Sequence, residues 1–132
     1  GVTLVTGDTK VVDRGKADRA AIRRAEALLA AGEAVAMFPE GSRSKSGTLG
    51  VGQPGAGLIL LRSGAPVLPV AVTGTERLPS GRGATIRFGP VVEIAATDAD
   101  RRLSPQEATN RLMATIAAML PDEYLPSGAE RT

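Results

Sequence analysis

The chain has 132 residues, of which 42% are hydrophobic and 23% are charged, a composition typical of a single globular domain. Its net charge is only +2 and 2% of its residues are aromatic, so nucleic-acid binding through a basic surface or base stacking is disfavoured. The chain has no cysteine and no histidine, which excludes a disulfide framework, thiol catalysis, a Ser-His-Asp triad and a zinc site built on Cys or His.

The first part of the chain predicts strands around one helix. Residues 1–14 hold two short β-branched stretches separated by a Gly-Asp turn, which predicts two strands. Residues 19–31 follow an Asp N-cap and place apolar side chains on one face of a helix that stops at Gly32. The apolar run 34–38 ends at Pro39 and predicts a strand that is buried on both faces.

The middle of the chain predicts a long loop, a helix and a strand. Residues 39–53 are rich in Gly, Ser and Thr and form the loop. The helix spans residues 55–63, with Pro54 in its first turn, and its interior is apolar nearly all round, so we expect it to be covered. Residues 67–72 predict a strand in which Pro69 favours an edge position or a break in the ladder.

The remainder predicts a second loop, two short strands and a last helix. Ser104 and Glu107 form a capping box with Pro at the first helical position, and Pro121 ends the helix. The expected elements are the loop 73–83, the strands 85–88 and 91–94, the helix from the capping box to Leu120, and a polar tail, 121–132.

The order of these elements predicts an α/β fold with a mostly parallel sheet flanked by helices. Residues 1–120 would form the domain and residues 121–132 the tail. Ligands of such sheets bind at the carboxyl ends of the strands. The loop 39–53 leaves the carboxyl end of the strand 34–38, so we expect the site there.

The start of this loop has the residue types of a phosphate cradle. Gly41 allows a positive φ that exposes backbone N–H groups, Ser42 and Ser44 add hydroxyls, and Arg43 can donate two parallel hydrogen bonds. Glu40 cannot bind phosphate but suits a hydroxyl group of the same ligand. The alternative is an ordinary strand exit with a solvated ion pair, since short Gly/Ser/Arg loops are common.

Arg14 ends the second β-branched stretch and brings another positive charge. It would lie near the cradle if its strand and the strand 34–38 are neighbours in a parallel sheet. The alternative is a surface arginine at a strand end.

Three motifs in order resemble the glycerolipid acyltransferases, the family of 1-acylglycerol-3-phosphate acyltransferases. VVDRG at 11–15 is similar to the family's second motif, FPEGSRS at 38–44 to its third, and GAPVLPVAV at 64–72 contains the apolar strand of its fourth. The resemblance covers most of residues 1–95, and three motifs in order are far more specific than one.

The family's first motif, a His followed four residues later by an Asp, is absent because the chain has no histidine. That motif supplies the catalytic base, so the resemblance assigns no catalytic residue to this chain. Gly1 is neither an initiator Met nor part of a signal-like segment, and we expect an N-terminally truncated domain that is inactive in isolation. Gln53 and Pro54 stand where the family usually has a Lys or Arg, so that contact is not carried over.

The resemblance implies transfer of a fatty acyl group from acyl-CoA or acyl-carrier protein to a lysophospholipid such as 1-acyl-sn-glycerol-3-phosphate, in phospholipid biosynthesis. Arg14 and Arg43 would bind the acceptor's phosphate, Glu40 and Gly41 would position its hydroxyls, and the strand of Pro69 would support the acyl-chain pocket. The implied substrate-binding residues are Arg14, Glu40, Gly41, Ser42, Arg43 and Pro69.

The resemblance implies neither a cofactor nor a metal ion, and no nucleic-acid partner. It implies contact with a membrane surface, on the cytoplasmic side, with the protein peripheral or anchored through a preceding N-terminal part. No run reaches the ~18 apolar residues of a membrane-spanning helix. The alternative function is a phosphate- or lipid-binding module without catalysis.

Overall fold

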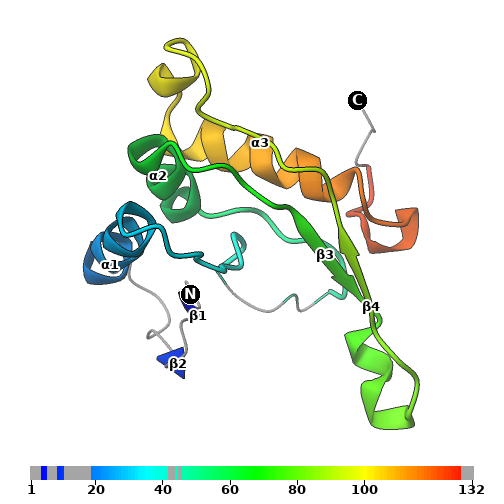
Figure 1. The fold of residues 1–132 in the computed structure, drawn as a ribbon. Coiled ribbons are helices and arrows are strands. Elements are labelled where there is room, and N and C mark those ends of the chain that lie inside the picture. The colour runs from blue at the N-terminus through cyan, green and yellow to red at the C-terminus, as the bar shows by residue number, and fades with distance from the viewer. Residues whose placement is uncertain (1–3, 6–8, 11–18, 42–43, 45, 129–132) are drawn as a thin grey trace.

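The computed structural model describes residues 4–5, 9–10, 19–41, 44 and 46–128 (Figure 1). Within them lie three α-helices, four short strands and three 3₁₀ turns. The helices are α1 (Arg19–Ala30), α2 (Pro54–Ser63) and α3 (Pro105–Ala117). The strands are β1 (Leu4–Val5), β2 (Thr9–Lys10), β3 (Val70–Thr73) and β4 (Thr85–Phe88), and the 3₁₀ turns are η1 (Thr75–Ser80), η2 (Asp100–Arg102) and η3 (Asp122–Tyr124).

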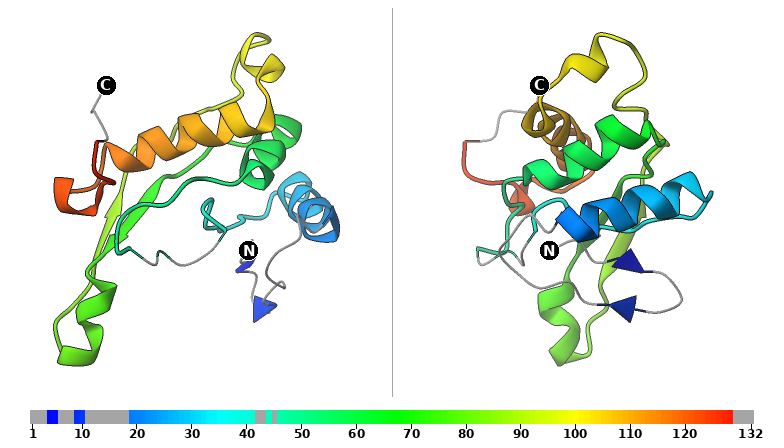
Figure 2. Two further views of the ribbon diagram at one scale, coloured as in Figure 1. Left: turned by 180° about the vertical axis from the view of Figure 1, so that it is seen from behind. Right: turned by 90° about the vertical axis from the view of Figure 1, so that its left-hand side faces the viewer.

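Helix α2 lies between α1 and α3 and packs against both (Figure 2). On one side, Ile59 of α2 forms a buried cluster with Ile22 and Ala25 of α1. On the other, Leu60 forms a second cluster whose remaining members are Ile94, Ala108 and Leu112. A helix that is apolar nearly all round is stable only when covered on several sides, and the prediction that α2 is covered is confirmed.

Glycine permits the close crossing of α2 and α3. A Cβ atom at Gly57 would overlap the Pro105 carbonyl oxygen, which is backbone and cannot move out of the way alone. The capping box predicted for α3 is present, because Ser104 Oγ accepts from the Glu107 N–H at 3.2 Å and Glu107 Oε2 accepts from the Ser104 N–H at 2.7 Å. The start of α3 is thereby fixed against α2.

Strands β3 and β4 form an antiparallel hairpin that projects beyond the helices, with η1 at its tip (Figures 1 and 2). Its register pairs Val70 with Phe88 at one end and Thr73 with Thr85 at the other. Below Val70 the ladder is interrupted at Pro69, which has no N–H to donate; pairing resumes at an isolated bridge between residues 67 and 92. The break in the ladder predicted at Pro69 is confirmed.

The mostly parallel sheet of the sequence analysis is not found in the part of the chain that the structure describes. That part holds two separate two-stranded sheets, β1–β2 and β3–β4, and both are antiparallel. Sheet direction depends on which distant segments pair, and the order of elements does not determine this alone.

The strand predicted over residues 34–38, buried on both faces, was wrong for this structure. The segment lies outside any strand, with Val35 and Met37 packed on the α1–α2 cluster while Phe38 is 63% exposed. An apolar run shows that residues want burial, but a strand also needs a neighbour for its N–H and C=O groups. Residues 91–94 are likewise not a strand, and only the bridge at Val92 remains.

Candidate functional site

The loop predicted to hold the site folds back on itself between two backbone hydrogen bonds. At its base the Gln53 N–H donates to the Pro39 carbonyl oxygen at 2.7 Å. At its start a turn is closed by the Gly41 N–H, which donates to the Phe38 carbonyl oxygen at 3.1 Å. Gly41 has a φ of +72°, so the positive φ predicted at this position is confirmed.

Glu40 closes the loop across its width. Its Oε2 accepts a hydrogen bond from the Gly50 N–H at 2.7 Å, ten residues further along the chain. A Cβ atom at Gly50 would lie 2.8 Å from the same oxygen, so the approach depends on a residue without a side chain. The carboxylate therefore holds the loop in shape with one of its two oxygens.

Hydroxyl groups brace the far part of the loop. Ser44 Oγ donates to the Thr48 carbonyl oxygen at 2.5 Å, and the Ser46 and Thr48 hydroxyls bond each other at 2.8 Å. These hydroxyls engage each other and the backbone, as Ser and Thr commonly do in turns.

The C-terminal arm of the loop is anchored by α3 and η3. Thr109 is fully buried in α3, and its hydroxyl donates to the Gln53 carbonyl oxygen at 2.9 Å while accepting from the Gly57 N–H at 2.8 Å. Gln106 Nε2 donates to the Gly52 carbonyl oxygen at 2.9 Å, and the Tyr124 carbonyl oxygen accepts from the amide of residue 49 at 2.7 Å. The sequence analysis missed these anchors, since it used α3 only for its apolar face.

The structure places the predicted site residues in two regions and leaves three outside its description. Glu40 and Gly41 are together in the loop, where their backbone forms the turn. Pro69 is buried at the base of the hairpin, where its carbonyl oxygen accepts from the Gly89 N–H at 2.9 Å. The residues that fall outside the described part are Arg14, Ser42 and Arg43. A shared phosphate site of the two arginines therefore stays a prediction.

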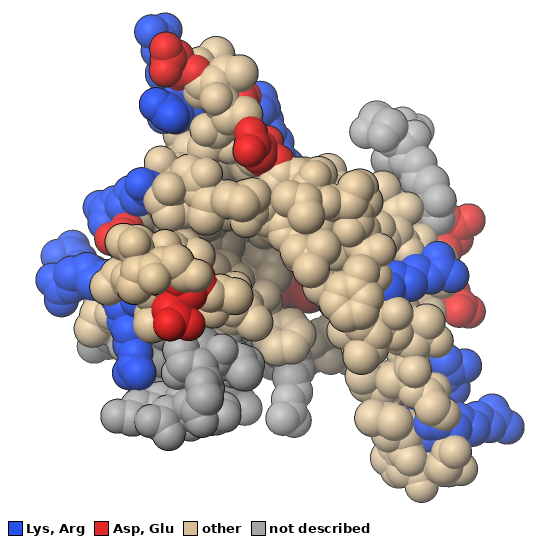
Figure 3. All heavy atoms as spheres, in the orientation of Figure 1, with Lys and Arg blue, Asp and Glu red and all other residues tan. Residues whose placement is uncertain are grey.

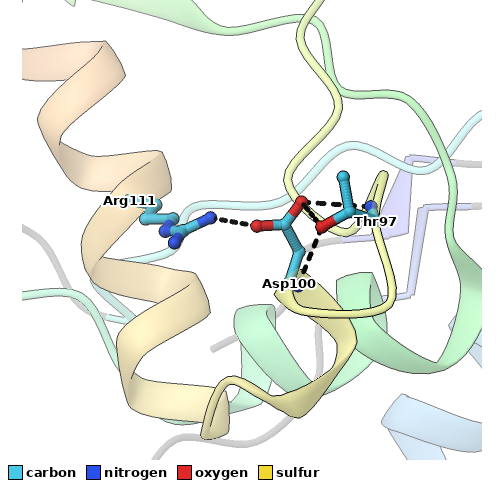
Figure 4. Close-up of polar contacts among 3 residues, drawn as sticks. All are labelled: Thr97, Asp100 and Arg111. Atoms are coloured by element: carbon cyan, nitrogen blue, oxygen red, sulfur yellow. Dashed lines mark hydrogen bonds and ion pairs between the residues drawn. The ribbon is translucent and has the colours of Figure 1, made fainter.

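A separate polar cluster joins η2 to α3 (Figure 4). Asp100 accepts from the Thr97 hydroxyl at 2.7 Å and from Arg111 at 2.6 Å. The Thr97 hydroxyl, followed by the Arg111 guanidinium, lowers the pKa of Asp100 below its usual value. Each contact connects neighbouring protein segments, so the cluster fastens the chain before α3.

The described residues contain no group of three or more acidic, His or Cys side chains that could hold a metal ion. No helix within the described ranges is both long enough and apolar enough to cross a bilayer.

Curated relatives are acyltransferases that act on one lipid. A 1-acyl-sn-glycerol-3-phosphate acyltransferase of Brassica napus, a chloroplastic protein, is 38% identical over 71 residues, which are 53% of this chain and 21% of the relative. Its Arabidopsis thaliana counterpart, also chloroplastic, is 37% identical over 71 residues, 53% of this chain and 20% of the relative. One from Chlamydomonas reinhardtii is 28% identical over 130 residues, 96% of this chain and 39% of the relative.

The chain thus spans between about a fifth and two fifths of the length of these relatives. No solved structure matches it significantly. The model of the Acyltransferase family matches residues 5–73, just over half of the chain, and this segment includes the loop 39–53 and all three motifs. The chain belongs to the Acyltransferase family.

Proposed function

We propose that this chain is the acceptor-binding part of an enzyme that transfers a fatty acyl group to 1-acyl-sn-glycerol-3-phosphate in phospholipid biosynthesis. The observation that carries the proposal is the closed loop 39–53, which lies inside the family match and is clamped by Glu40 on Gly50. A loop held at its base and across its width presents the residues after Gly41 with little loss of conformational freedom on binding.

The acceptor's phosphate is assigned to Arg43, Ser42 and Arg14. Ser42 and Arg43 directly follow the turn at Gly41, so they are within two residues of its positive-φ backbone. A guanidinium binds phosphate through two parallel hydrogen bonds, which orient the ligand as well as attract it.

Glu40 is assigned to a hydroxyl of the acceptor's glycerol. Its Oε2 is held by the Gly50 N–H, and this bond fixes the direction of the carboxylate. The other oxygen is the one that we assign to the hydroxyl. Pro69 is buried, so its part in acyl-chain binding would be indirect, through fixing where β3 begins.

The chemical step needs a base that these residues do not supply. In the proposed reaction a histidine, oriented by an aspartate, takes the proton of the acceptor's hydroxyl. The hydroxyl oxygen attacks the thioester carbonyl of acyl-CoA or acyl-carrier protein, an ester bond forms, and the thiol leaves with a proton. The chain has no histidine, so we expect the purified 132-residue protein to show no acyl transfer above a blank without enzyme.

The extended segment 34–38 is proposed as a strand of the parallel sheet in the complete enzyme, which would act at the cytoplasmic face of a membrane. Alternate residues of this segment already pack on the α1–α2 cluster, as one face of a sheet strand would.

Calorimetric titration tests the binding proposal. The chain is titrated below micelle-forming concentrations with 1-acyl-sn-glycerol-3-phosphate and with 1-acylglycerol, which lacks the phosphate. We expect binding of the first only, and Arg43→Ala should weaken it about ten- to a hundredfold, as loss of a charged hydrogen bond of ~1.5–3 kcal/mol would.

The matched control is Arg102→Ala, which removes an exposed arginine of η2. An equal loss in both variants would show that general positive charge, and no phosphate cradle, attracts the lipid. Equal affinity for the two lipids would also overturn the proposal.

The alternative, a lipid-binding module without catalysis, rests on the complete lack of histidine. It predicts the same titration result for the isolated chain. The two functions separate in the longer protein: acyl transfer that disappears on substitution of a His-x4-Asp histidine establishes the enzyme, whereas binding without transfer establishes the module.

A further inference from the structure

One face of the β3–β4 hairpin is apolar and uncovered. Side chains alternate between the faces of a strand, and directly paired residues share a face. The pairs Val70 with Phe88 and Val72 with Ile86 therefore lie on one face, which leaves Ala71, Thr73, Thr85 and Arg87 on the other. We call the first the outer hairpin face; its residues, 37–68% exposed, are Leu68, Val70, Val72, Ile86, Phe88 and Val91.

The two faces of the hairpin differ in chemistry. The inner side lines a cavity of about 190 Å³ with polar and charged groups, among them Thr73, Arg87 and Tyr124. The outer hairpin face contains no charged side chain, and Figure 3 shows a broad uncharged surface over β3 and β4, with blue side chains at its lower end and right edge. An exposed apolar surface of this extent on a soluble protein indicates a contact site.

The hairpin also carries the chain's excess of positive charge. Residues 68–91 contain three arginines, Arg77, Arg82 and Arg87, and one acid, Glu76, so three minus one gives +2. The whole chain, 16 minus 14, is also +2, so all other residues together are neutral. Two of the arginines belong to the tip, where Leu78 is 54% exposed between them in the sequence.

Charge decides between two occupants of this face. A second copy of the chain would bring another hairpin of charge +2 against the first, and like charges at a rim oppose association. An anionic bilayer offers an apolar interior for the outer hairpin face and negative headgroups for the tip, with ~1 kcal/mol gained per Arg near the surface.

We propose that the outer hairpin face docks on an anionic lipid bilayer. Phe88 and Ile86 enter the boundary between headgroups and acyl chains, and Arg77 and Arg82 lie at the level of the lipid phosphates. The proposal extends the proposed function by assigning the surface on which a lipid acceptor would be met. Its test requires neither acceptor binding nor acyl transfer, so it can fail or succeed independently.

Vesicle flotation with the 132-residue chain tests the proposal. We expect the chain to float with phosphatidylcholine vesicles that contain phosphatidylglycerol, to float poorly with phosphatidylcholine alone, and to be released by salt. Phe88→Ser removes apolar surface without changing charge, and should weaken binding about tenfold. Arg82→Glu should weaken binding by a similar factor and reduce its salt dependence.

The control is Ala114→Glu, which adds a negative charge at an exposed position of α3. It should bind nearly as the unchanged chain does, and thermal melts should confirm that each variant folds. Equal losses in Ala114→Glu and Arg82→Glu would mean that only total charge matters and would overturn the proposal. Concentration-dependent dimers that disappear in Phe88→Ser, with no vesicle binding by the unchanged chain, would assign the face to a second copy.

Discussion

Replacing Thr109 by valine tests how the site loop is anchored. The substitution keeps the shape of the side chain and removes one hydroxyl, which bonds the Gln53 carbonyl oxygen and the Gly57 N–H. These two backbone groups are four residues apart, the spacing of a helical hydrogen bond at the start of α2. The hydroxyl thus links α3 simultaneously to the end of the loop and to the first turn of α2.

The expected cost follows from the two bonds and their burial. Each hydrogen bond contributes ~1 kcal/mol net, and a buried group left without a partner costs ~1–3 kcal/mol, so Thr109→Val should reduce the free energy of unfolding by ~2–3 kcal/mol. For a chain of this length, that loss lowers Tm by roughly 10 °C. Thr109→Ser is the control, since it keeps the hydroxyl and loses only the methyl that packs near Gly52, at a cost of ~1 kcal/mol.

Urea denaturation of the three proteins, followed by circular dichroism, measures these differences. The amide exchange rates of residues 50–53 should also rise in Thr109→Val. If valine were tolerated within ~0.5 kcal/mol, the freed Gly57 N–H and Gln53 carbonyl would have found each other and the anchoring role would be refuted. A serine variant as unstable as the valine variant would show that the methyl, and not the hydroxyl, is required.

Three further substitutions test other parts of the fold. Gly57→Ala should destabilise the chain by ~2–3 kcal/mol in urea, because its Cβ overlaps backbone of α3, whereas Gly55→Ala, with open space around its Cβ, should be neutral or stabilising. Glu40→Ala should speed exchange of the Gly50 amide about tenfold, corresponding to a lost charged hydrogen bond; unchanged exchange would contradict the clamp. The pKa of Asp100 is lowered on folding, so its stabilisation is present above the unfolded pKa and is lost as pH falls through the folded value; Asp100→Asn should flatten the decline of Tm below about pH 4, and an unaltered decline would count against it.

The helices could be predicted from the sequence because their signals are local. The capping box at Ser104 and Glu107, the stop at Gly64 and the first-turn Pro54 each act within a few residues, and the structure confirms all three. The same is true of Gly41, whose positive φ is required by the turn itself.

The sheet could not be predicted in the same way, since pairing joins segments far apart in sequence. The run 34–38 and the strand β3 have similar apolar compositions, yet only β3 has a partner in the described structure. The anchors of the site loop have the same cause. Thr109 bonds Gly57 across 52 positions, and nothing in the pattern around Thr109 distinguishes it from an ordinary polar residue of α3.

The clamp by Glu40 changes how substitutions in the third motif should be interpreted. A residue that only contacted the acceptor could be replaced without altering the free protein, but Glu40 also holds Gly50, ten residues away. Loss of its carboxylate would therefore let the loop open and move the residues after Gly41, even where the phosphate ligands are intact. A fall in acceptor affinity on substituting Glu40 combines two effects, a lost contact and a displaced cradle. Exchange of the Gly50 amide in the unliganded chain reports the second effect alone, so measuring both quantities in one variant separates positioning from contact.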